Sequence, residues 1–434
     1  EYSVEQEPNR AIITSKWGEI ETAEVKKDTQ VRYLGGVKSP ILTEVKKSDK
    51  VTVLEDEDDW MKVATADGYV GYIKTKFLKN QKKEKTSRDF TEPVYSDMTE
   101  DHSINMAWHN VTNAAANNAV QQVLASTSGL TTIAPTWFSL ADTEGNISSI
   151  ADADYVNYAH TAGLEVWAVF RDFHGGTNSY DETYETLRYT SKRAKLEDQV
   201  VAAAVAAGVD GINLDFELIS SKCGVHYVQL VRELSVKCHQ NNLVFSVDNY
   251  VPQSYNSHYD LKEQGIVADY VVIMAYDEHT EGSYEAGSVA SISYLQDGIE
   301  KTLKKVSADK VIAGIPFFTR LWFETAKSPE QLSEEAGTEA ASYPNKVSSK
   351  ALGMEEAAQS VVNAGATAQW DEKTQQNYAK WSADGGTYRI WLEDAQSLEA
   401  KLKVIQENKL AGVAEWSLGK EESSVWKLIS QYVN

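Results

Sequence analysis

Short apolar runs recur along the chain from residue 104 onward and alternate with amphipathic or Ala-rich stretches. Helical segments such as 196–207 and 225–239 separate most of these runs. Strands that alternate with helices in this way are typical of a parallel (β/α)₈ TIM barrel, an α/β fold. We predict its eight strands at residues 104–111, 132–138, 164–170, 209–215, 243–247, 270–275, 311–316 and 411–416.

The interval between the seventh and eighth predicted strands is too long for a single crossover. Residues 353–364 have helical periodicity, and Asp384-Gly385-Gly386 is typical of a hairpin turn. We therefore expect a small α+β insertion after strand seven, at about residues 323–389.

The N-terminal part of the chain has a different pattern, in which short alternating runs at 51–54 and 61–64 are broken by acidic turns. It predicts a small all-β domain over residues 1–80, including an N-terminal extension. The Lys-rich, polar stretch that follows shows no apolar periodicity and predicts a linker over 81–99, before a barrel domain at 100–434.

The run VLEDEDDWMKVATADGYVGYIKTKFL at residues 53–78 resembles bacterial SH3-type domains. Domains of that kind often bind cell-wall material, so the resemblance implies a wall-binding module. The alternative is a spacer that only packs on its neighbour.

Charge and cysteine content narrow the class of protein. The chain has 434 residues and a formal net charge of −22, which disfavours nucleic acid and, weakly, anionic lipid as partners. No apolar run has the length of a membrane span. Its two cysteines, Cys223 and Cys238, form no metal pattern or disulfide scaffold, and a bridge between them stays open. We expect a monomer without metal or cofactor.

The first residue is Glu rather than Met. We therefore expect that an N-terminal signal or anchor has been removed, and that the protein is extracellular or belongs to the cell envelope.

The stretch from Asp210 to Glu217 carries the candidate chemistry. Alternation along a strand turns Asn213, Asp215 and Glu217 into the barrel, while the apolar residues between them face the helices. Glu217 falls at the carboxyl end of its strand, where barrel enzymes place catalytic groups. Two carboxylates held close together cannot both ionise freely, so one keeps a proton. The alternative is an internal salt-bridge network without a catalytic role.

This segment resembles the active-site signature of glycoside hydrolase family 18, the chitinase family. Three further elements match that family in order: Met274-Ala275-Tyr276-Asp277, the run from Gly314 to Trp322, and the strand ending in Glu415-Trp416. The resemblance covers residues of about 100 to 434.

The resemblance implies roles for five residues. Glu217 is the general acid and later the general base, and Asp215 orients the N-acetyl group of the substrate. Tyr276 hydrogen-bonds the acetamido oxygen, Trp416 stacks under the sugar, and Asp210 is a supporting acid. In that chemistry the acetamido oxygen itself attacks the anomeric carbon through an oxazolinium ring, and the configuration is retained.

The sequence places other residues in or near this cleft. Asn213 stands where many relatives carry Asp, which implies a shifted pH profile, and Phe318 stands where Tyr is common. Arg320 is a candidate for a muramic acid carboxylate or else for a structural ion pair, and Trp137 lines the cleft or packs in the core. The complete predicted substrate-binding set is Trp416, Asn213, Asp277, Met274, Asn249, Arg320 and Trp137.

Within the family, the residues at 135–138, 248–250 and 277–279 resemble a Gram-positive branch that joins a wall-binding module to the barrel and includes spore-cortex enzymes. The resemblance favours a peptidoglycan N-acetylglucosaminidase. A chitinase and an endo-β-N-acetylglucosaminidase acting on N-glycans use the same chemistry and stay open. The alternative from another class is a catalytically silent lectin, which the presence of Glu217 disfavours.

Overall fold

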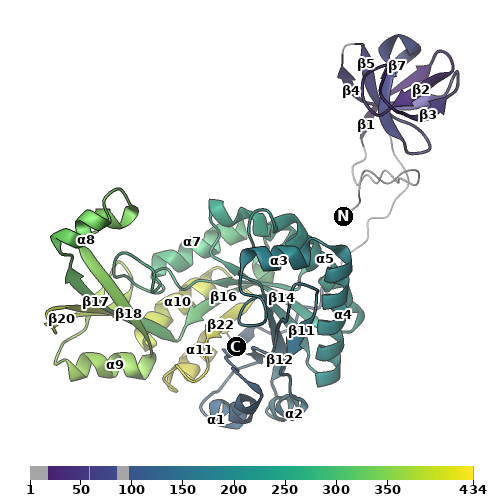
Figure 1. The fold of residues 1–434 in the computed structure, drawn as a ribbon. Helices are drawn as coiled ribbons and strands as arrows, with labels where there is room; N and C mark the ends of the chain where they lie inside the picture. Colours follow the sequence, from purple (N-terminus) through teal and green to yellow (C-terminus); the bar gives the residue numbers. More distant parts are fainter. Residues whose placement is uncertain (1–17, 58, 86–96, 434) are drawn as a thin grey trace. The chain divides into compact units, whose positions relative to one another are not determined.

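The computed structural model describes residues 18–57, 59–85 and 97–433. These residues fall into two compact units, an all-β unit within residues 18–85 and a larger α/β unit within 97–433 (Figure 1). The expected N-terminal extension, at 1–17, and much of the expected linker, at 86–96, lie outside the described residues.

The small unit is one antiparallel sheet of seven strands in the order β3-β2-β6-β5-β4-β1-β7. Alternate residues of its strands face a core that includes Val25, Val31, Val63 and Ile73, each fully buried. The predicted all-β character is confirmed. Its strands are β1 (Glu19–Val25), β2 (Thr29–Arg32), β3 (Ile41–Val45), β4 (Lys50–Glu57), β5 (Trp60–Ala64), β6 (Val70–Lys74) and β7 (Leu78–Lys85).

Strand β7 corrects one detail of the sequence analysis. The Lys-rich stretch that we expected to begin a linker at residue 81 continues this strand to Lys85, antiparallel to β1. Lys79 lies 2.8 Å from Glu24, and Lys83 lies 3.0 Å from Glu19. Opposite charges on neighbouring strands therefore stabilise a strand that has almost no apolar residues.

The larger unit is built around eight parallel strands, as predicted. Their order is β9-β12-β13-β14-β15-β16-β22-β8, and β8 pairs with β9 to close the barrel. Two short strands, β10 (Phe138–Leu140) and β11 (Ile147–Ser149), extend the sheet beside β12. The barrel strands are β8 (Ile104–His109), β9 (Thr132–Pro135), β12 (Glu165–Arg171), β13 (Gly211–Asp215), β14 (Val244–Tyr250), β15 (Tyr270–Met274), β16 (Val311–Pro316) and β22 (Gly412–Trp416).

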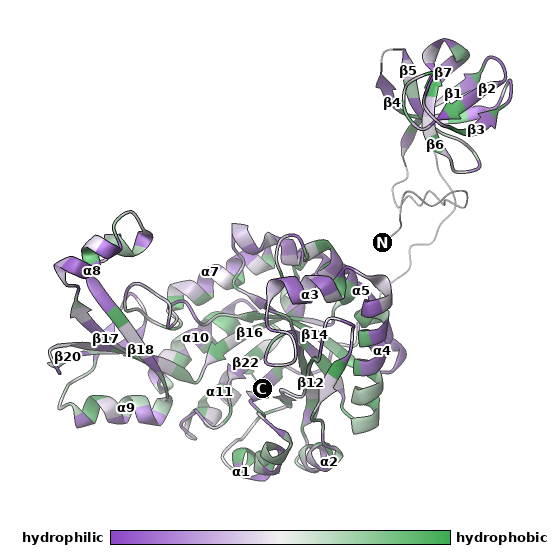
Figure 2. Ribbon diagram, in the orientation of Figure 1, coloured by the Kyte–Doolittle hydropathy of each residue, from purple (hydrophilic) through white to green (hydrophobic). Residues whose placement is uncertain are grey.

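Helices surround the barrel with their apolar faces inward and polar faces outward (Figure 2). In α5, for example, Leu230, Leu234 and Cys238 recur every four residues and are fully buried. The helix α4 ends at Gly208, whose φ of 77° is the left-handed cap that glycine favours. The helices are α1 (Val120–Leu124), α2 (Ala153–Thr161), α3 (Tyr180–Leu187), α4 (Thr190–Ala207), α5 (Gly224–Gln240), α6 (Leu261–Val267), α7 (Ile292–Leu303), α10 (Ala395–Glu407) and α11 (Val425–Val433).

The insertion after the seventh barrel strand is larger than predicted. The expected helix is α9 and the expected hairpin joins β20 to β21, but both belong to a five-stranded antiparallel sheet in the order β18-β17-β21-β20-β19. Leu352, Val361 and Ile390 form part of its own small core. Its elements are β17 (Phe318–Ala326), α8 (Pro329–Glu334), β18 (Asn345–Gly353), α9 (Met354–Asn363), β19 (Gln369–Asp371), β20 (Gln376–Ala383) and β21 (Gly386–Leu392).

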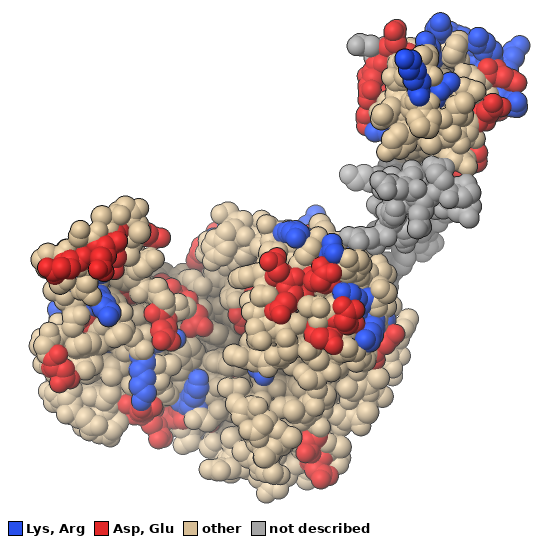
Figure 3. All heavy atoms as spheres, in the orientation of Figure 1, with Lys and Arg blue, Asp and Glu red and all other residues tan. Residues whose placement is uncertain are grey.

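Strand β17 begins only two residues after β16 ends at Pro316. The predicted seventh strand ended at residue 316 and the predicted insertion began at about residue 323. In the structure Phe318 and Arg320 already belong to the insertion sheet, on β17 where it pairs with β18. Acidic side chains gather over α8, at the far end of the same sheet (Figure 3).

Both cysteines are free and buried in the helical layer of the barrel. Across the described ranges, none of the helices combines the length and apolarity that crossing a bilayer requires.

Candidate active site

Strand β13 brings the predicted polar residues to the inside of the barrel. Ile212 and Leu214 pack in the layer between sheet and helices, so the intervening Asn213 and Asp215 face the interior. Asn213 is fully buried, and Asp215 is 7% exposed. Glu217 follows the carboxyl end of the strand and is half-buried.

Asn213 joins β13 to the next strand. Its Nδ2 donates to Ser246 Oγ at 2.9 Å and to Asp248 Oδ1 at 2.7 Å. Its Oδ1 accepts a hydrogen bond of 3.0 Å from the indole nitrogen of Trp108. The amide therefore presents a donor to Asp248 where a carboxylate would present a second negative charge.

Glu217 is fixed through its backbone and its carboxylate. Its amide donates to Asp172 Oδ1 at 2.8 Å, and its carbonyl accepts from the Tyr259 hydroxyl at 3.1 Å. The hydroxyl of Tyr250 donates directly to Glu217 Oε2. One carboxylate oxygen is thus held by a neutral donor, and Oε1 stays available to a substrate.

Asp172, Asp215, Glu217 and Asp248 form what we call the acid cluster. Burial raises the pKa of Asp215 well above its usual range, and the charge of Glu217 raises it further. Burial likewise raises the pKa of Glu217, and it raises the pKa of Asp248 to about 8 and that of Asp172 to about 7.

Arg171 is the cation that opposes the upward shift of the pKa of Asp215. Asp215 Oδ1 and Asp248 Oδ2 are buried without a hydrogen-bond partner among the described residues. Four carboxyl groups with few hydrogen bonds and one opposing cation do not all ionise near neutral pH. The acid cluster therefore holds at least one proton that it can transfer.

Aromatic rings form the wall beside the acid cluster. Trp108 makes an edge contact with Tyr276 at 6.4 Å between ring centroids and a tilted contact with Trp416 at 5.9 Å. Met274 is buried in the same interior cluster. Trp416 is the more exposed of the two indoles.

Asp277 and Arg320 lie at the same open end of the barrel. Asp277 follows Tyr276 with a φ of 58°, a left-handed conformation. The positive charges of Arg320 and Lys420 act against the burial that raises the pKa of Asp277. Arg320 Nη1 donates to Ser349 Oγ at 2.9 Å, across the insertion sheet.

Asp210 does not join this group. It precedes β13 and lies at the opposite end of the strand, where its Oδ2 accepts from the amide of Val166 and lies near His160 Nε2, both at 2.8 Å. These contacts fix the start of β13, so we do not count Asp210 among the residues that act on the substrate.

Asn249 and Trp137 are also separate from the acid cluster. Asn249 turns away from the interior and donates to Gln264 Oε1 at 2.7 Å. Trp137 packs in the layer between sheet and helices and donates to Asn117 Oδ1 at 2.8 Å. For Asn249 this follows from strand alternation, because its neighbour Asp248 faces the interior, whereas Trp137 lies in the segment between β9 and β10.

Four residues of the site were not predicted from the sequence. Ser246, Asp248 and Tyr250 alternate on β14 just as the predicted residues do on β13, and this signal was available. Asp172 was not predictable in this way, because it follows β12 and its role depends on which backbone amides it meets.

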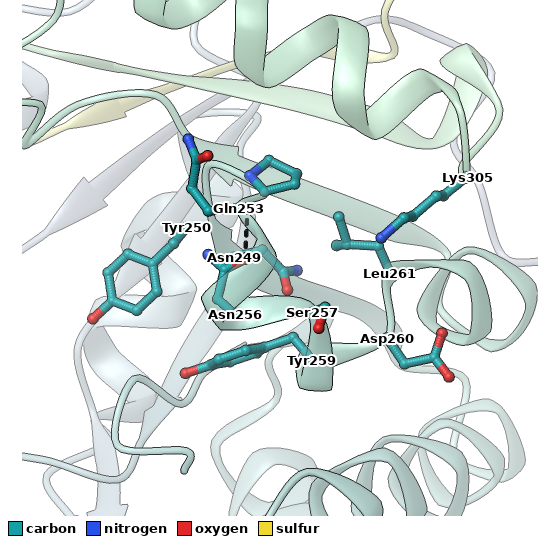
Figure 4. Close-up of a pocket in the computed structure, with 10 residues that line it drawn as sticks. Asn249, Tyr250, Gln253, Asn256, Ser257, Tyr259, Asp260, Leu261 and Lys305 are labelled. Atoms are coloured by element: carbon teal, nitrogen blue, oxygen red, sulfur yellow. Dashed lines mark hydrogen bonds between the residues drawn. The ribbon is translucent and has the colours of Figure 1, made fainter. Parts of the chain in front are cut away.

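A pocket beside β14 adjoins the site (Figure 4). Asn249, Gln253 and Asn256 line it, and the Gln253 amide donates to Asn256 Oδ1 at 2.7 Å. The hydroxyl groups of Tyr250 and Tyr259 project to one side of it, toward the bonds with Glu217 described above. Within the described ranges, no three His, Cys, Asp or Glu side chains come together as a metal site.

Comparison with known families gives two matches. The family described as glycosyl hydrolases family 18 matches residues 108–421, which contain the acid cluster and the aromatic wall. The bacterial SH3 domain matches residues 26–79 of the small unit.

Three relatives illustrate the similarity. A glycosylase of Bacillus subtilis, YvbX, is 26% identical over 66% of this chain and 80% of its own length. The cortical fragment-lytic enzyme of Bacillus subtilis is 27% identical over 56% of this chain but only 54% of its own length. The spore cortex-lytic enzyme SleL of Bacillus megaterium has a TM-score of 0.62 and 20% identity, covering 79% of this chain and 76% of SleL.

Proposed function

The chain belongs to glycosyl hydrolases family 18, and from this premise we propose that it is a retaining N-acetylglucosaminidase of peptidoglycan. The observation that carries the proposal is the position of Glu217. It is a half-buried carboxyl group with a raised pKa at the carboxyl end of β13, close to Asp215 and hydrogen-bonded by Tyr250. A group of this kind keeps its proton until a glycosidic oxygen approaches.

The first step breaks the glycosidic bond. The acetamido oxygen of the sugar attacks the anomeric carbon while the leaving oxygen takes the proton of Glu217. The sugar becomes a cyclic oxazolinium ion, and Glu217 becomes a carboxylate. The hydroxyl of Tyr250 already donates to Glu217 Oε2 and stabilises the charge that develops there.

Asp215 and Tyr276 hold the acetamido group during this step. Asp215 Oδ1 has no partner among the described residues and accepts the acetamido N–H. The Tyr276 hydroxyl donates to the acetamido oxygen. The negative charge of the acid cluster stabilises the positive ring.

In the second step a water molecule attacks the anomeric carbon from the side that the leaving group vacated. Glu217 takes a proton from this water, the oxazolinium ring opens, and the original configuration is restored. The exposed face of Trp416 supports the sugar throughout. These roles use neither a metal ion nor a second carboxylate as nucleophile.

Peptidoglycan is the substrate we favour because the small unit resembles bacterial SH3 domains and one relative is named a cortical fragment-lytic enzyme. We propose that the small unit binds the wall and that the protein acts outside the cell or in its envelope. We keep the division into a wall-binding domain, a linker and a catalytic domain as part of this proposal, with the linker starting after Lys85.

The test is a digest of purified peptidoglycan, with chitin oligosaccharides in parallel, in which mass spectrometry identifies the new reducing ends. We expect new GlcNAc reducing ends from peptidoglycan, and their loss in Glu217→Gln. Glu372→Gln, exposed in the turn after β19, is the matched control and should retain activity.

The other outcomes assign the alternatives. Cleavage of chitin oligosaccharides alone would keep the mechanism and change the substrate. If the wild-type protein releases no reducing ends from either polymer, the lectin becomes the favoured alternative, and N-glycans are the next substrate to test.

A further inference from the structure

Two cations that form no ion pair with a carboxylate at contact distance lie near each other at the mouth of the barrel. Among the described residues, the Lys420 ammonium makes no hydrogen bond or ion pair, and the Arg320 guanidinium makes one hydrogen bond, to Ser349. Arg320 Nε is buried without a partner. Both side chains are half-buried, so water compensates their charges only in part.

These cations lie one aromatic ring away from the proposed reaction centre. Lys420 Nζ is 5.0 Å from the centroid of the Phe318 ring, and this ring lies 6.3 Å from that of Tyr276. Arg320 is two residues beyond Phe318 on β17 and therefore projects from the same face of the strand.

The backbone of Lys420 is fixed from the insertion. The amide of Met354, the first residue of α9, donates to the Lys420 carbonyl at 2.8 Å. A Cβ atom on Gly353 would lie 3.0 Å from the same carbonyl oxygen. Arg320 is held by its strand and by Ser349, so the guanidinium and the backbone that carries Lys420 are both fixed before a ligand arrives.

The charge around the pair is unusual for this protein. The chain carries a net charge of −22. Asp277 is a carboxylate in electrostatic contact with both cations, and the trio of Arg320, Lys420 and Asp277 keeps one positive charge in excess. An excess of positive charge at a half-buried position favours the binding of an anion.

We propose that Arg320 and Lys420 form a subsite for a carboxylate carried by the sugar polymer, an inference that rests on the proposed function and deepens it. Because Nη1 of Arg320 is engaged with Ser349 and Nε is buried, Nη2 is the guanidinium nitrogen that meets the carboxylate, through a charge-assisted hydrogen bond. Lys420 supplies the second positive charge. Chitin has no such carboxylate, so the subsite selects peptidoglycan over chitin.

Two parts of peptidoglycan offer this chemistry. One is the lactyl carboxylate of a muramic residue without a peptide, and the other is a carboxylate of the attached peptide. The experiment therefore uses soluble glycan strands with peptides, the same strands after removal of the peptides, and both after conversion of their carboxylates to methyl esters.

The readout is the ratio of kcat/KM for each charged strand to that for its ester. For the wild-type protein we expect a ratio of roughly ten or more, within the range of hydrogen bonds to charged groups. It should fall toward one in Arg320→Met and Lys420→Met and recover in part in Lys420→Arg. Lys380→Met, exposed on β20 of the insertion sheet, is the matched control and should keep the wild-type ratio.

The strand that gives the high ratio identifies the carboxylate. A ratio that is the same in the wild type and in both Met variants, with unchanged melting temperatures, would overturn the subsite while leaving the glucosaminidase intact. If the wild type cleaves neither strand, the proposed function fails, and calorimetric titration of Glu217→Gln with the charged and esterified strands then decides on the subsite alone.

Discussion

Single residues set the proton balance of the site. Asn213 is the clearest case, since it donates to Asp248 and accepts from Trp108 within the fully buried interior. An Asp at this position would add a charge next to Asp248, whose pKa burial already raises to about 8. The identity of one side chain thus decides how many protons the acid cluster carries.

Tyr250→Phe should move the alkaline limb of activity to higher pH. Burial raises the pKa of Glu217, and the hydrogen bond from the Tyr250 hydroxyl lowers it. Removing this hydroxyl therefore raises the pKa of Glu217 further. A general acid with a higher pKa stays protonated to higher pH. The measurement is kcat/KM against pH on a soluble oligosaccharide.

Tyr259→Phe is the control for that profile, because this hydroxyl bonds only the backbone carbonyls of Phe216 and Glu217. We expect it to lower activity without moving the alkaline limb. An equal displacement of the limb in both variants would mean that the shift reports a rearranged loop rather than the lost hydrogen bond to the carboxylate.

At the scale of the elements, alternation along strands accounts for what was predictable. It places Asn213 and Asp215 inside the barrel correctly and would have placed Asp248 there too. It did not find the start of the insertion, which was predicted at about residue 323 and lies at Phe318, and it did not identify β7, whose strand depends on charge pairs with β1. Contacts between segments distant in sequence decided both cases.

Strand β22 contains a buried acid, Glu415, whose effect on the stability of the folded state depends on pH. Both carboxylate oxygens of Glu415 are buried without a partner among the described residues, and burial raises its pKa well above its usual value. An acid with a raised pKa in the folded state destabilises that state progressively as the pH rises above the unfolded pKa of about 4.3. The native protein should therefore gain stability from this residue as the pH falls.

Glu415→Gln tests this, since the amide keeps the shape of the side chain and cannot ionise. We expect its melting temperature to exceed that of the wild type by several degrees at pH 8 and by much less at pH 5, by differential scanning calorimetry. Equal differences at the two pH values would assign the effect to packing.

At the scale of the whole molecule, the two units have separate cores, and each contributes a different proposed activity. The barrel carries the acid cluster, and the small unit contains none of its members. We therefore expect catalysis and wall attachment to be separable by deletion.

Deleting residues 1–85 should reduce activity on insoluble wall about tenfold or more while changing kcat/KM on a soluble oligosaccharide less than twofold, since attachment raises the local concentration of enzyme only on the polymer. Release of reducing ends from both substrates is the measurement. Equal losses on the two would remove the targeting role of the small unit.

The contact between Gly353 and the Lys420 carbonyl also bears on how such enzymes diversify. The insertion sheet and the loop after β22 meet backbone to backbone, and a Cβ atom at residue 353 would lie 3.0 Å from the carbonyl oxygen of Lys420. Another insertion grafted onto this barrel without a glycine at that junction would therefore shift the loop that bears Lys420 by a few tenths of an ångström. A change of insertion would in this way also change the position of Lys420, and with it the proposed selectivity for the substrate.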